Sequence, residues 1–327
     1  MQKQKEVRSS VIKSLRHICR ARVYSDVDLG RISWWRIGGR ASVFVNLASV
    51  EEVVAVRKLL SLSDFPSVVI GETTNLLFSD GRVDAVVLQI SDNLSAVTID
   101  GTTVSAGSGI STSHLSEVLA SANLTGGEHF CDIPGSLGGL IVMNGGSKRL
   151  SISNSLISVD VVTPEGSLKS VNAQDCRFTY RGSIFQDSDD VIVGATLKFD
   201  EGPGVDQIKS KMSEIRLERR NKFPSGYPNC GSVFKSSPEL YESVGPPGQI
   251  IESMGLRGAR IGDAAISERH GNFFENLGQA TAEDMLTLIC STRRKVKEET
   301  GFDLATEVRF VSNDGRIAPV DQFCSKA

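Results

Sequence analysis

The stretch Asp132-Ile-Pro-Gly-Ser-Leu-Gly-Gly-Leu-Ile-Val-Met-Asn-Gly-Gly146 decides how the rest of the chain is organised. It places five glycines and one proline among fifteen residues, and the side chains from Leu137 to Met143 are mainly apolar and favour burial. A buried segment must find acceptors for its backbone N–H groups, and a bound anion such as a pyrophosphate supplies them. The stretch therefore predicts either an anion-binding loop or a tight turn that joins two buried elements.

The composition excludes several classes of protein. The chain has 327 residues, enough for two or three domains, and its formal charge of −3 makes nucleic acid an improbable partner. No run of 18 apolar residues predicts a membrane span, and the first residues lack the apolar core of a signal peptide. The glycine spacing is not that of a Rossmann dinucleotide site.

The cysteines and histidines point to no metal centre. Six cysteines are scattered along the chain without a C-x-x-C pair, which argues against both a zinc site and a disulfide framework. The four histidines lie in distant settings and form no cluster in the sequence. We therefore expect no metal and a cytoplasmic location.

The first part of the chain reads as an α/β unit. Residues 5–22 predict a basic helix, expected to be a surface helix or a frayed arm. A strand over residues 41–47 precedes a helix that starts at the capping-box pattern Ser49-Val-Glu-Glu52 and runs to about Leu60. A strand over 67–70, a polar turn over 71–75 and a short segment over 76–78 follow. Ligand sites of such units lie at strand ends.

The second part is rich in short β-strands. Runs of β-branched residues predict strands at 86–90, 96–99, 103–106, 157–163, 168–171 and 191–199. Asp100-Gly101 and Pro164-Glu-Gly166 predict hairpin turns, and one helix is expected at 113–122. The glycine-rich stretch lies within this α+β region.

A third region begins with a helix over residues 205–221. Its end carries the cations Arg216, Arg219, Arg220 and Lys222, which either complement the helix dipole or receive phosphates. Helices are expected near 249–254 and 281–297, the latter opened by Thr281-x-x-Asp284, and a strand is expected at 305–311.

Three reactive groups stand in unusual sequence settings. Arg181 follows Tyr180 after a strand, Ser232 comes directly after a glycine, and Glu307 lies in a strand-like end segment. Taken singly, they also fit a surface charge, a turn residue and a solvated strand face. No G-x-S-x-G pattern or nearby His and Asp surrounds Ser232, so a hydrolase triad is not predicted.

An ordered series of motifs runs along the chain: Arg36-Ile-Gly-Gly39, Asn75-Leu-Leu77, Gly127-Glu-His-Phe-Cys-Asp-Ile-Pro-Gly-Ser-Leu-Gly-Gly139, Met143-Asn-Gly145, Phe178-Thr-Tyr-Arg-Gly-Ser183, Tyr227-Pro-Asn-Cys-Gly-Ser-Val-Phe-Lys235, Ile251-Glu-Ser-Met-Gly-Leu-Arg-Gly258, Ser267-Glu-Arg-His-Gly-Asn-Phe273, Asn276-Leu-Gly-Gln-Ala-Thr-Ala282 and Thr306-Glu-Val308. In this combination, the motifs resemble the FAD-dependent UDP-N-acetylenolpyruvoylglucosamine reductase family from about Leu29 to Phe310. The short link between Phe199 and Val205 resembles the subtype that lacks a tyrosine loop.

The resemblance implies an α+β fold with a vanillyl-alcohol-oxidase-type, two-part FAD-binding region and a C-terminal substrate-binding domain. The expected divisions are residues 23–90 and 91–204 for FAD, 205–304 for substrate and 305–327 for a final strand and tail. The implied partners are NADPH and a UDP-sugar, with no nucleic acid and no membrane. The oligomeric state is left open.

The resemblance also implies roles for individual residues. Ser232 matches the family's proton donor, and Arg181 and Glu307 match groups that face the negative charge formed on the substrate. The expected FAD-binding residues are Gly71, Thr73, Thr74, Asn75, Leu76, Ile133, Pro134, Gly135, Ser136, Gly138, Gly139, Asn144, Arg181 and Val193. The expected substrate-binding residues are Tyr180, Arg219, Tyr227, Asn229, Lys235 and Ser236.

Some positions depart from the family pattern. Thr73 stands in place of a glycine and requires either a conventional φ or strain. Leu140 replaces an alanine, Ser236 an asparagine that reaches substrate, and Asp263 a glycine. The main prediction is a reductase of a UDP-sugar enolpyruvyl ether. The alternatives are a flavin oxidoreductase of the same fold that acts on another unsaturated acid, and a catalytically idle flavin- or nucleotide-binding protein.

Overall fold

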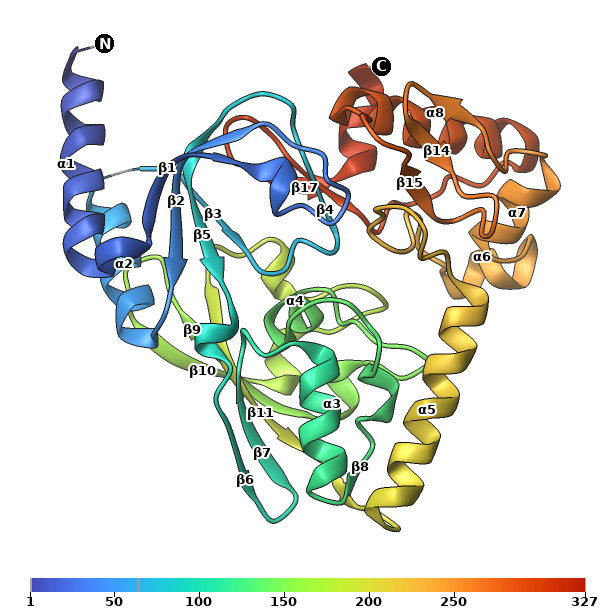
Figure 1. Cartoon of the computed structure of the whole chain (residues 1–327), viewed down its shortest axis with the longest axis horizontal. Helices are drawn as coiled ribbons and strands as arrows, with labels where there is room; N and C mark the ends of the chain where they lie inside the picture. The colour runs from blue at the N-terminus through green and yellow to red at the C-terminus, as the bar shows by residue number, and fades with distance from the viewer. Residues whose placement is uncertain (1, 64, 327) are drawn as a thin grey trace. The chain divides into compact units, whose positions relative to one another are not determined.

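The computed structural model describes residues 2–63 and 65–326 and divides the chain into two compact units (Figure 1). The first unit comprises Met1–Ser25, Val43–Glu72 and Val86–Arg219. The second comprises Asp26–Ser42, Thr73–Ala85 and Arg220–Ala327. Each unit draws on three separate segments of sequence. The four divisions expected from the sequence are finer than these units and stay a prediction.

A five-stranded antiparallel sheet forms the centre of the first unit. Its order is β10-β9-β11-β7-β6, with bounds Leu168–Asn172, Leu156–Val162, Val191–Lys198, Thr103–Gly107 and Val97–Asp100. The β6–β7 and β9–β10 pairs are the two hairpins predicted from their turn residues. Both hairpin predictions are therefore confirmed.

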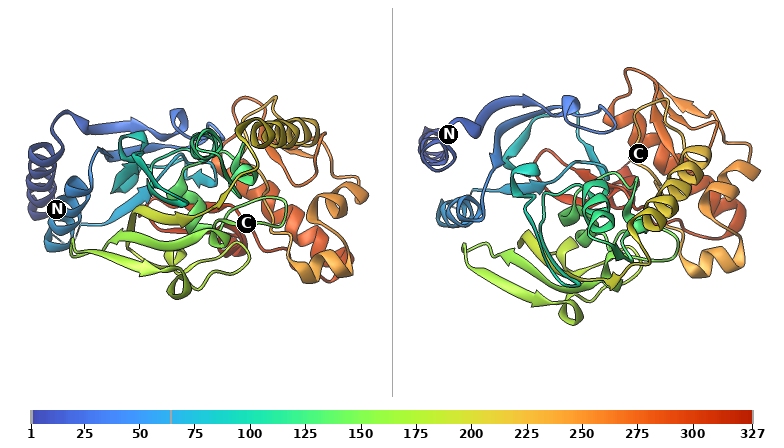
Figure 2. Two further views of the ribbon diagram at one scale, coloured as in Figure 1. Left: turned by 90° about the horizontal axis from the view of Figure 1, so that it is seen from below. Right: turned by 60° about the horizontal axis from the view of Figure 1, so that its bottom comes forward.

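Two helices cover this sheet on one side (Figure 2). Helix α3 (Thr112–Ser121) packs Leu115 and Leu119 into the same core as Leu137 and Ile141 of α4 (Leu137–Val142). The glycine-rich stretch therefore contains a six-residue helix, which the sequence did not predict. Its apolar side chains build the core, as their hydrophobicity required.

A second layer of the first unit contains α1 (Gln2–Cys19) and α2 (Val50–Ser63), which lie side by side (Figures 1 and 2). A sheet of order β1-β2-β5-β3 has bounds Val23–Asp28, Arg40–Leu47, Val83–Ile90 and Ser67–Ile70, with β3 parallel to β5. Val11, Leu15 and Cys19 of α1 are buried in the core shared with α2. Helix α1 is therefore a surface helix, one of the two expected alternatives, and its apolar stripe packs against the core while most of its other described side chains are exposed or partly exposed.

Helix α5 (Val205–Lys222) buries Ile208, Met212 and Ile215 against Ala120 and Cys131 in the first unit. The short strand β12 (Asp200–Glu201), which precedes this helix in the sequence, pairs antiparallel with β8 (Leu124–Thr125). The 3-10 helices of the chain are η1 Arg20–Arg22, η2 Leu29–Arg31, η3 Asp92–Leu94, η4 Glu128–Phe130, η5 Ile152–Asn154, η6 Ala173–Cys176, η7 Ile184–Gln186 and η8 Val320–Lys326.

Among its described residues, the second unit contains two small sheets and three α-helices that lie wholly within it, besides η2 and η8. One sheet has the order β17-β16-β4, with bounds Ile317–Pro319, Arg309–Val311 and Leu76–Phe78, and the other has β13 Arg260–Ile261, β14 Ala264–Ile266 and β15 Phe274–Asn276. The helices are α6 (Pro238–Ser243), α7 (Pro247–Ser253) and α8 (Ala282–Thr300). Strand β16 is shorter than the strand predicted at residues 305–311, because Thr306 pairs only through an isolated bridge with Phe234.

The ends of α8 follow the sequence signals. The Thr281 hydroxyl accepts the Asp284 amide at 3.0 Å, and the Asp284 carboxylate accepts the Thr281 amide at 3.0 Å. This reciprocal capping box was predicted from the spacing of the two residues. At the other end, Gly301 takes a φ of 77°, a left-handed conformation that glycine adopts readily and that ends the helix.

A disulfide joins Cys290 of α8 to Cys324 of η8. The expectation that the cysteines would form no disulfide was wrong at this pair. The two residues are 34 positions apart, and the absence of C-x-x-C spacing excludes only local pairs. Cys19, Cys131, Cys176 and Cys230 are free and buried.

No helix among residues 2–63 and 65–326 combines the length and apolar character needed to cross a membrane.

His129, in η4 of the first unit, is a buried titratable group. It is only 3% exposed, its Nδ1 donates to the Gly126 carbonyl at 3.1 Å, and its Nε2 has no hydrogen-bond partner among the described residues. Burial lowers its pKa from 6.5 to about 4, against the opposing effects of the Gly126 bond and the Glu128 carboxylate. The imidazole is therefore neutral in the folded protein at pH 7.

We expect His129 to make the protein less stable in mild acid. Its pKa is lower in the folded than in the unfolded state, so between pH 6.5 and 4 the unfolded chain binds more protons and stability falls as pH falls. From pH 7 to pH 5 the wild type should lose about 2 kcal/mol more unfolding free energy than His129→Gln, whose amide can still donate to Gly126. Urea unfolding at both pH values measures this, and equal losses in the two proteins would contradict the assignment.

Candidate functional site

The residues expected to form the site fall in both units. Those of the first unit are Gly71, the segment 133–139, Asn144, Tyr180, Arg181, Val193 and Arg219. Those of the second unit are Thr73, Thr74, Asn75, Leu76, Tyr227, Asn229, Ser232, Lys235, Ser236 and Glu307. Each group is described within its own unit.

In the first unit, the loop at residues 71–72 packs against the loop at 135–136. A Cβ placed on Gly71 would lie 2.9 Å from the Ser136 hydroxyl, so only glycine fits here without displacing that side chain. The Glu72 carboxyl faces the backbone of Gly135. Burial raises the pKa of this carboxyl, and the backbone of Gly135 acts in the opposite direction. The structure thus brings Gly71 and Ser136 together beside Gly135, while their contact with FAD stays a prediction.

Backbone hydrogen bonds fix the glycine-rich loop onto the sheet. The Gly138 amide donates to the Ser108 carbonyl at 2.8 Å, and the Ser108 amide donates to the Val193 carbonyl at 3.1 Å. The Ser108 hydroxyl donates to Ile192 at 2.8 Å. Val193 therefore contributes through its backbone, at the point where β11 is irregular. Ser108 was not predicted, because a serine after a strand carries no distinctive sequence signal.

The exposure pattern of this loop fits a ligand held by backbone groups. Leu137 and Leu140 are buried, whereas Gly139 is exposed and Gly135 and Gly138 are partly exposed. The loop therefore presents glycine backbone to its surroundings while its apolar side chains face the core. This is the arrangement by which a loop binds the phosphates of a dinucleotide such as FAD.

Asn144 and Arg181 form a second cluster in the first unit. Both residues have positive φ, 43° and 53° respectively. The Asn144 amide donates to the Thr179 carbonyl at 2.8 Å, and the Arg181 guanidinium donates to the carbonyls of Asn144 at 3.4 Å and Gly146 at 3.2 Å. The guanidinium also lies 5.3 Å from the centre of the Tyr180 ring. These contacts link Arg181 to the end of the glycine-rich stretch.

Arg219 of α5 contacts the start of the same stretch. Its Nε donates to the Asp132 carbonyl at 3.2 Å and lies 3.8 Å from the Asp132 carboxylate, and burial lowers the pKa of the guanidinium. Arg216, one turn earlier, pairs with Glu117 at 2.5 Å. Both arginines therefore have carboxylate partners within the first unit. A role for Arg219 toward substrate phosphates stays a prediction.

In the second unit, the turn at residues 73–76 is strained and stabilised by side-chain bonds. Thr73 has a φ of 59°, the strained alternative that its replacement of glycine had left open. Its hydroxyl donates to the Ile32 carbonyl at 2.9 Å. The Asn75 side chain donates to the Glu307 carbonyl at 2.9 Å, and the Arg309 amide donates to Asn75 at 3.1 Å. Asn75 and Glu307 thus lie together.

Ser232 and Glu307 share one backbone framework. Gly231, with a φ of 75°, donates its amide to the Asn229 side chain at 3.1 Å, and Ser232 follows this turn. The carbonyl of the next residue, Val233, accepts the Glu307 amide at 2.7 Å. The structure therefore brings the expected proton donor and the expected carboxylate onto adjacent backbone segments.

Asn272 is a further residue of this framework, to which the sequence assigned no role. Its side-chain oxygen accepts the Phe234 amide at 2.9 Å, its side-chain nitrogen donates to the Phe234 carbonyl at 2.9 Å, and it is 3% exposed. The Val233 amide also donates to the Asn272 carbonyl at 2.9 Å. The residue lies within a motif of the family, but its clamp on Phe234 is visible only in three dimensions.

The remaining expected substrate-binding residues lie near this segment in sequence. Tyr227 is 50% exposed, and its carbonyl accepts the Asn229 side chain at 3.0 Å. Lys235 donates its backbone amide to Ala305 at 2.9 Å, and Ser236 is partly buried. Their contacts with a substrate stay a prediction.

One departure from the family pattern has a structural explanation. Asp263 accepts the Arg260 guanidinium at 2.8 Å and the Gln279 amide at 2.9 Å. The side chain therefore stabilises the turn between β13 and β14.

Within the described part of the chain, no group of three or more His, Cys, Asp or Glu side chains is placed to bind a metal ion.

Comparison with known proteins gives consistent matches along the whole chain. Residues 41–172 match an FAD binding domain, and residues 223–311 match the C-terminal domain of UDP-N-acetylenolpyruvoylglucosamine reductase. UDP-N-acetylenolpyruvoylglucosamine reductase 1 of Corynebacterium glutamicum is 37% identical over 97% of this chain and 95% of that protein. The reductase of Lachnoclostridium phytofermentans is 36% identical over 92% of this chain and 97% of its own length.

The fold matches a solved structure as well. The crystal structure of the UDP-N-acetylenolpyruvylglucosamine reductase of Thermus caldophilus has a TM-score of 0.74 at 29% identity. The match covers 88% of this chain and 98% of that one. The predicted α+β fold, with an FAD-binding domain followed by a C-terminal domain, is confirmed.

We expect Gly138→Val to weaken FAD binding. A Cβ at this position would lie 3.2 Å from the Ser108 Cβ and 3.3 Å from its carbonyl oxygen, and the larger side chain would push the loop off the sheet. The Kd for FAD should rise by about tenfold or more, which corresponds to about 1.4 kcal/mol. Flavin absorbance of the purified protein and titration of the apoprotein measure it. Gly226→Val, at a glycine with open space around it, is the control. Unchanged FAD affinity in Gly138→Val would exclude the loop from the site.

Proposed function

This chain belongs to the UDP-N-acetylenolpyruvoylglucosamine reductase family, and we propose on that basis that it reduces UDP-N-acetylglucosamine enolpyruvate to UDP-N-acetylmuramate. It is an FAD-dependent oxidoreductase of peptidoglycan precursor synthesis that uses NADPH. The observation that carries the proposal is the identity of 37% over nearly the full length of both proteins. We place the reaction in the cytoplasm, where both UDP-sugar and NADPH are available.

The residues present fit FAD. We propose that FAD binds through residues of the first unit, namely Gly71, Ile133, Pro134, Gly135, Ser136, Gly138, Gly139, Asn144, Arg181 and Val193. The resemblance also assigns Thr73, Thr74, Asn75 and Leu76 to FAD. Bound there, FAD would supply the hydride-transfer chemistry between NADPH and the enolpyruvyl substrate. The backbone of Gly71 and Gly135 is partly exposed, which supports phosphate binding by amides, whereas the Gly138 amide is bonded to the Ser108 carbonyl.

The protein's own side chains then control the charge and the proton. Hydride addition at one carbon leaves negative charge on the carboxylate-bearing neighbour, which must be protonated there. We propose that the Ser232 hydroxyl donates this proton and that Arg181, a permanent cation, binds the substrate carboxylate. Glu307 assists in the same step, because a carboxyl group stabilises such charge when it is protonated or orients a donor.

Substrate binding is assigned by resemblance to Tyr180, Arg219, Tyr227, Asn229, Lys235 and Ser236. The departures that favoured a different unsaturated acid carry less weight once the structure is considered. Thr73 takes a φ of 59°, a conformation that glycine adopts readily, and its hydroxyl bonds to the Ile32 carbonyl. Asp263 serves a turn between two strands. Both changes are explained within the second unit without a change of substrate.

The proposed reaction predicts two separable flavin signals. NADPH should bleach the yellow protein under anaerobic conditions, and UDP-N-acetylglucosamine enolpyruvate should then restore its colour. Stopped-flow absorbance of the flavin measures both steps. A reduced protein that is reoxidised by other unsaturated acids, but not by the UDP-sugar, would overturn the proposed substrate.

Ser232→Ala should affect only the second of these steps. Flavin reduction by NADPH needs no proton from the serine and should proceed at nearly the wild-type rate. Reoxidation by the UDP-sugar should slow by a factor of roughly 10²–10⁴, the range of general acid catalysis. Ser232→Cys should recover part of the loss, since a thiol also donates a proton. Reoxidation of Ser232→Ala at the wild-type rate would show that the serine is only a turn residue.

A further inference from the structure

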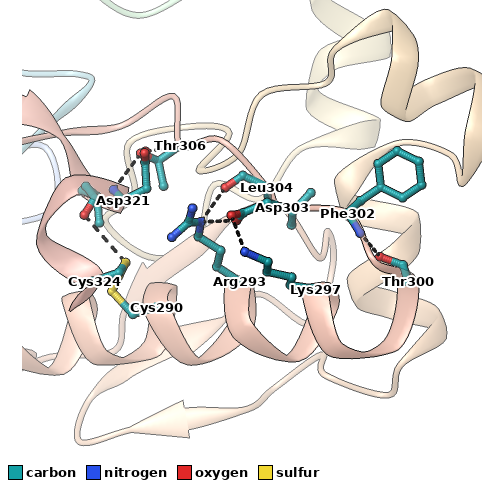
Figure 3. A network of polar contacts seen from close by, with 11 residues as sticks. Cys290, Arg293, Lys297, Thr300, Phe302, Asp303, Leu304, Thr306, Asp321 and Cys324 are labelled. Carbon is teal, nitrogen blue, oxygen red and sulfur yellow. Dashed lines mark hydrogen bonds and ion pairs between the residues drawn. A yellow bond between two sulfur atoms is a disulfide. The ribbon is translucent and has the colours of Figure 1, made fainter. Parts of the chain in front are cut away.

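The residue that precedes Glu307 is held by the C-terminal tail (Figure 3). Thr306 is 1% exposed, and its amide donates to the Asp321 carboxylate at 3.1 Å. Its hydroxyl also donates to this carboxylate, and the Asp321 amide donates back to the hydroxyl at 3.2 Å. Asp321 therefore fixes both the backbone and the side chain of Thr306.

Helix α8 holds the same segment from its other end. Arg293 contacts the Asp303 carboxylate at 2.6 Å and donates to the Leu304 carbonyl at 3.0 Å, and Lys297 contacts Asp303 at 2.9 Å. Figure 3 shows these side chains rising from α8 toward the segment. Residues 303–306 are thus tied to α8 on one side and to the tail on the other.

The disulfide joins these two supports covalently. Cys290 lies on α8, three residues before Arg293, and Cys324 lies three residues after Asp321. The disulfide, the Arg293–Asp303 ion pair and the Thr306–Asp321 hydrogen bond together close a ring (Figure 3). Residues 303–306, which lead to Glu307, are part of this ring. Both cysteines are partly exposed, whereas Cys19, Cys131, Cys176 and Cys230 are buried. Redox reagents can therefore reach this pair selectively.

We propose that Asp321 is a positioning residue for Glu307 and that reversible formation of the Cys290–Cys324 disulfide controls it. The proposal rests on the proposed function, in which Glu307 acts on the enolpyruvyl substrate. Glu307 follows Thr306 directly, and its amide and carbonyl bond to Val233 and Asn75. A shift of Thr306 therefore moves Glu307 within the framework that also carries Ser232.

The redox step is a thiol–disulfide exchange. A small-molecule disulfide accepts two electrons and two protons from the Cys290 and Cys324 thiols, which become linked, and is released as two thiols. A dithiol reverses the reaction and is itself oxidised to a cyclic disulfide. In a reducing compartment such a disulfide is transient, which fits a sensor of oxidation rather than a permanent structural disulfide.

Thiol counting tests the disulfide without using activity. The full-length FAD-bound protein is treated with oxidised glutathione or with dithiothreitol, freed of the reagent by gel filtration, and labelled with maleimide under native conditions. We expect two more labelled cysteines after reduction, mapped by mass spectrometry to Cys290 and Cys324. Equal labelling after both treatments would overturn the proposal, whatever the protein's substrate.

Flavin kinetics on the same samples test the link to Glu307. Reduction of the disulfide should slow reoxidation by the UDP-sugar by about 10- to 100-fold, the cost of misplacing a catalytic group by about 1 Å, and leave reduction by NADPH unchanged. The Cys290→Ser/Cys324→Ser double variant should be slow in both states. A wild type that the UDP-sugar does not reoxidise in either state contradicts the proposed function instead.

Variants of the tail separate positioning from general stability. Asp321→Ala should slow reoxidation to the level of the reduced protein, and Asp321→Asn should restore most of the rate, because its amide oxygen can still accept the Thr306 amide. Gln322→Ala, which removes a neighbouring tail contact with Arg316, is the matched control and should behave as wild type. If Asp321→Ala slows both half-reactions equally, or slows neither, Asp321 does not position Glu307.

Discussion

The hydrogen bond from the Glu307 amide to the Val233 carbonyl, at 2.7 Å, is the contact on which the second unit's chemistry depends. Ser232 precedes the acceptor, and Phe234, which follows it, is clamped on both backbone groups by Asn272. The Glu307 carbonyl in turn accepts the Asn75 side chain. The side chains that we propose to react, those of Ser232 and Glu307, are thus carried by paired backbone segments rather than by free loops. Such support gives a catalytic group a defined position before substrate binds.

In the first unit, the glycine-rich stretch exposes backbone groups that a ligand can contact, and its side chains still fill the core. The stretch from Asp132 to Gly146 does this by directing its leucines inward and its glycines outward. Bonds from Gly138 to Ser108 and from Ser108 to Val193 then fix the loop on the sheet. Arg181 contacts the far end of the stretch and Arg219 its beginning, so both ends of the loop are held by guanidinium groups.

Local signals in the sequence predicted most of the elements. The capping box at Thr281 and the hairpin turns at Asp100 and Pro164 act between neighbouring residues and are found. At Ser49 only half of the predicted box is present, because the hydroxyl accepts the Glu52 amide but the Glu52 carboxylate accepts the amide of Ala48. Contacts between distant residues were not predicted: the short helix α4 exists because its side chains fill a core built by other segments. The Cys290–Cys324 bond depends on where η8 lies, which spacing along the chain does not reveal.

The candidate site was predicted by a different route. Residue type alone also allowed purely structural explanations for Arg181, Ser232 and Glu307. Their positions within the ordered family motifs made them candidates for the site. The motifs did not predict the supporting residues. Ser108, Asn272 and Asp321 bond to backbone groups of other residues, and such contacts are visible only in the structure. Thr73 shows the converse limit, because only the structure decides between a conventional φ and a strained one stabilised by Ile32.

The second unit is discontinuous in sequence, and this has a consequence for synthesis on the ribosome. Its segments 26–42 and 73–85 emerge early, but they must wait for residues after 220 before they can fold. At elongation rates of about 5–20 residues per second, the wait lasts roughly ten to fifty seconds. During this time Trp35, Ile37 and Leu77, which end in the second unit's core, remain without that core. The nascent chain therefore offers these apolar side chains to chaperones that bind near the ribosome exit tunnel.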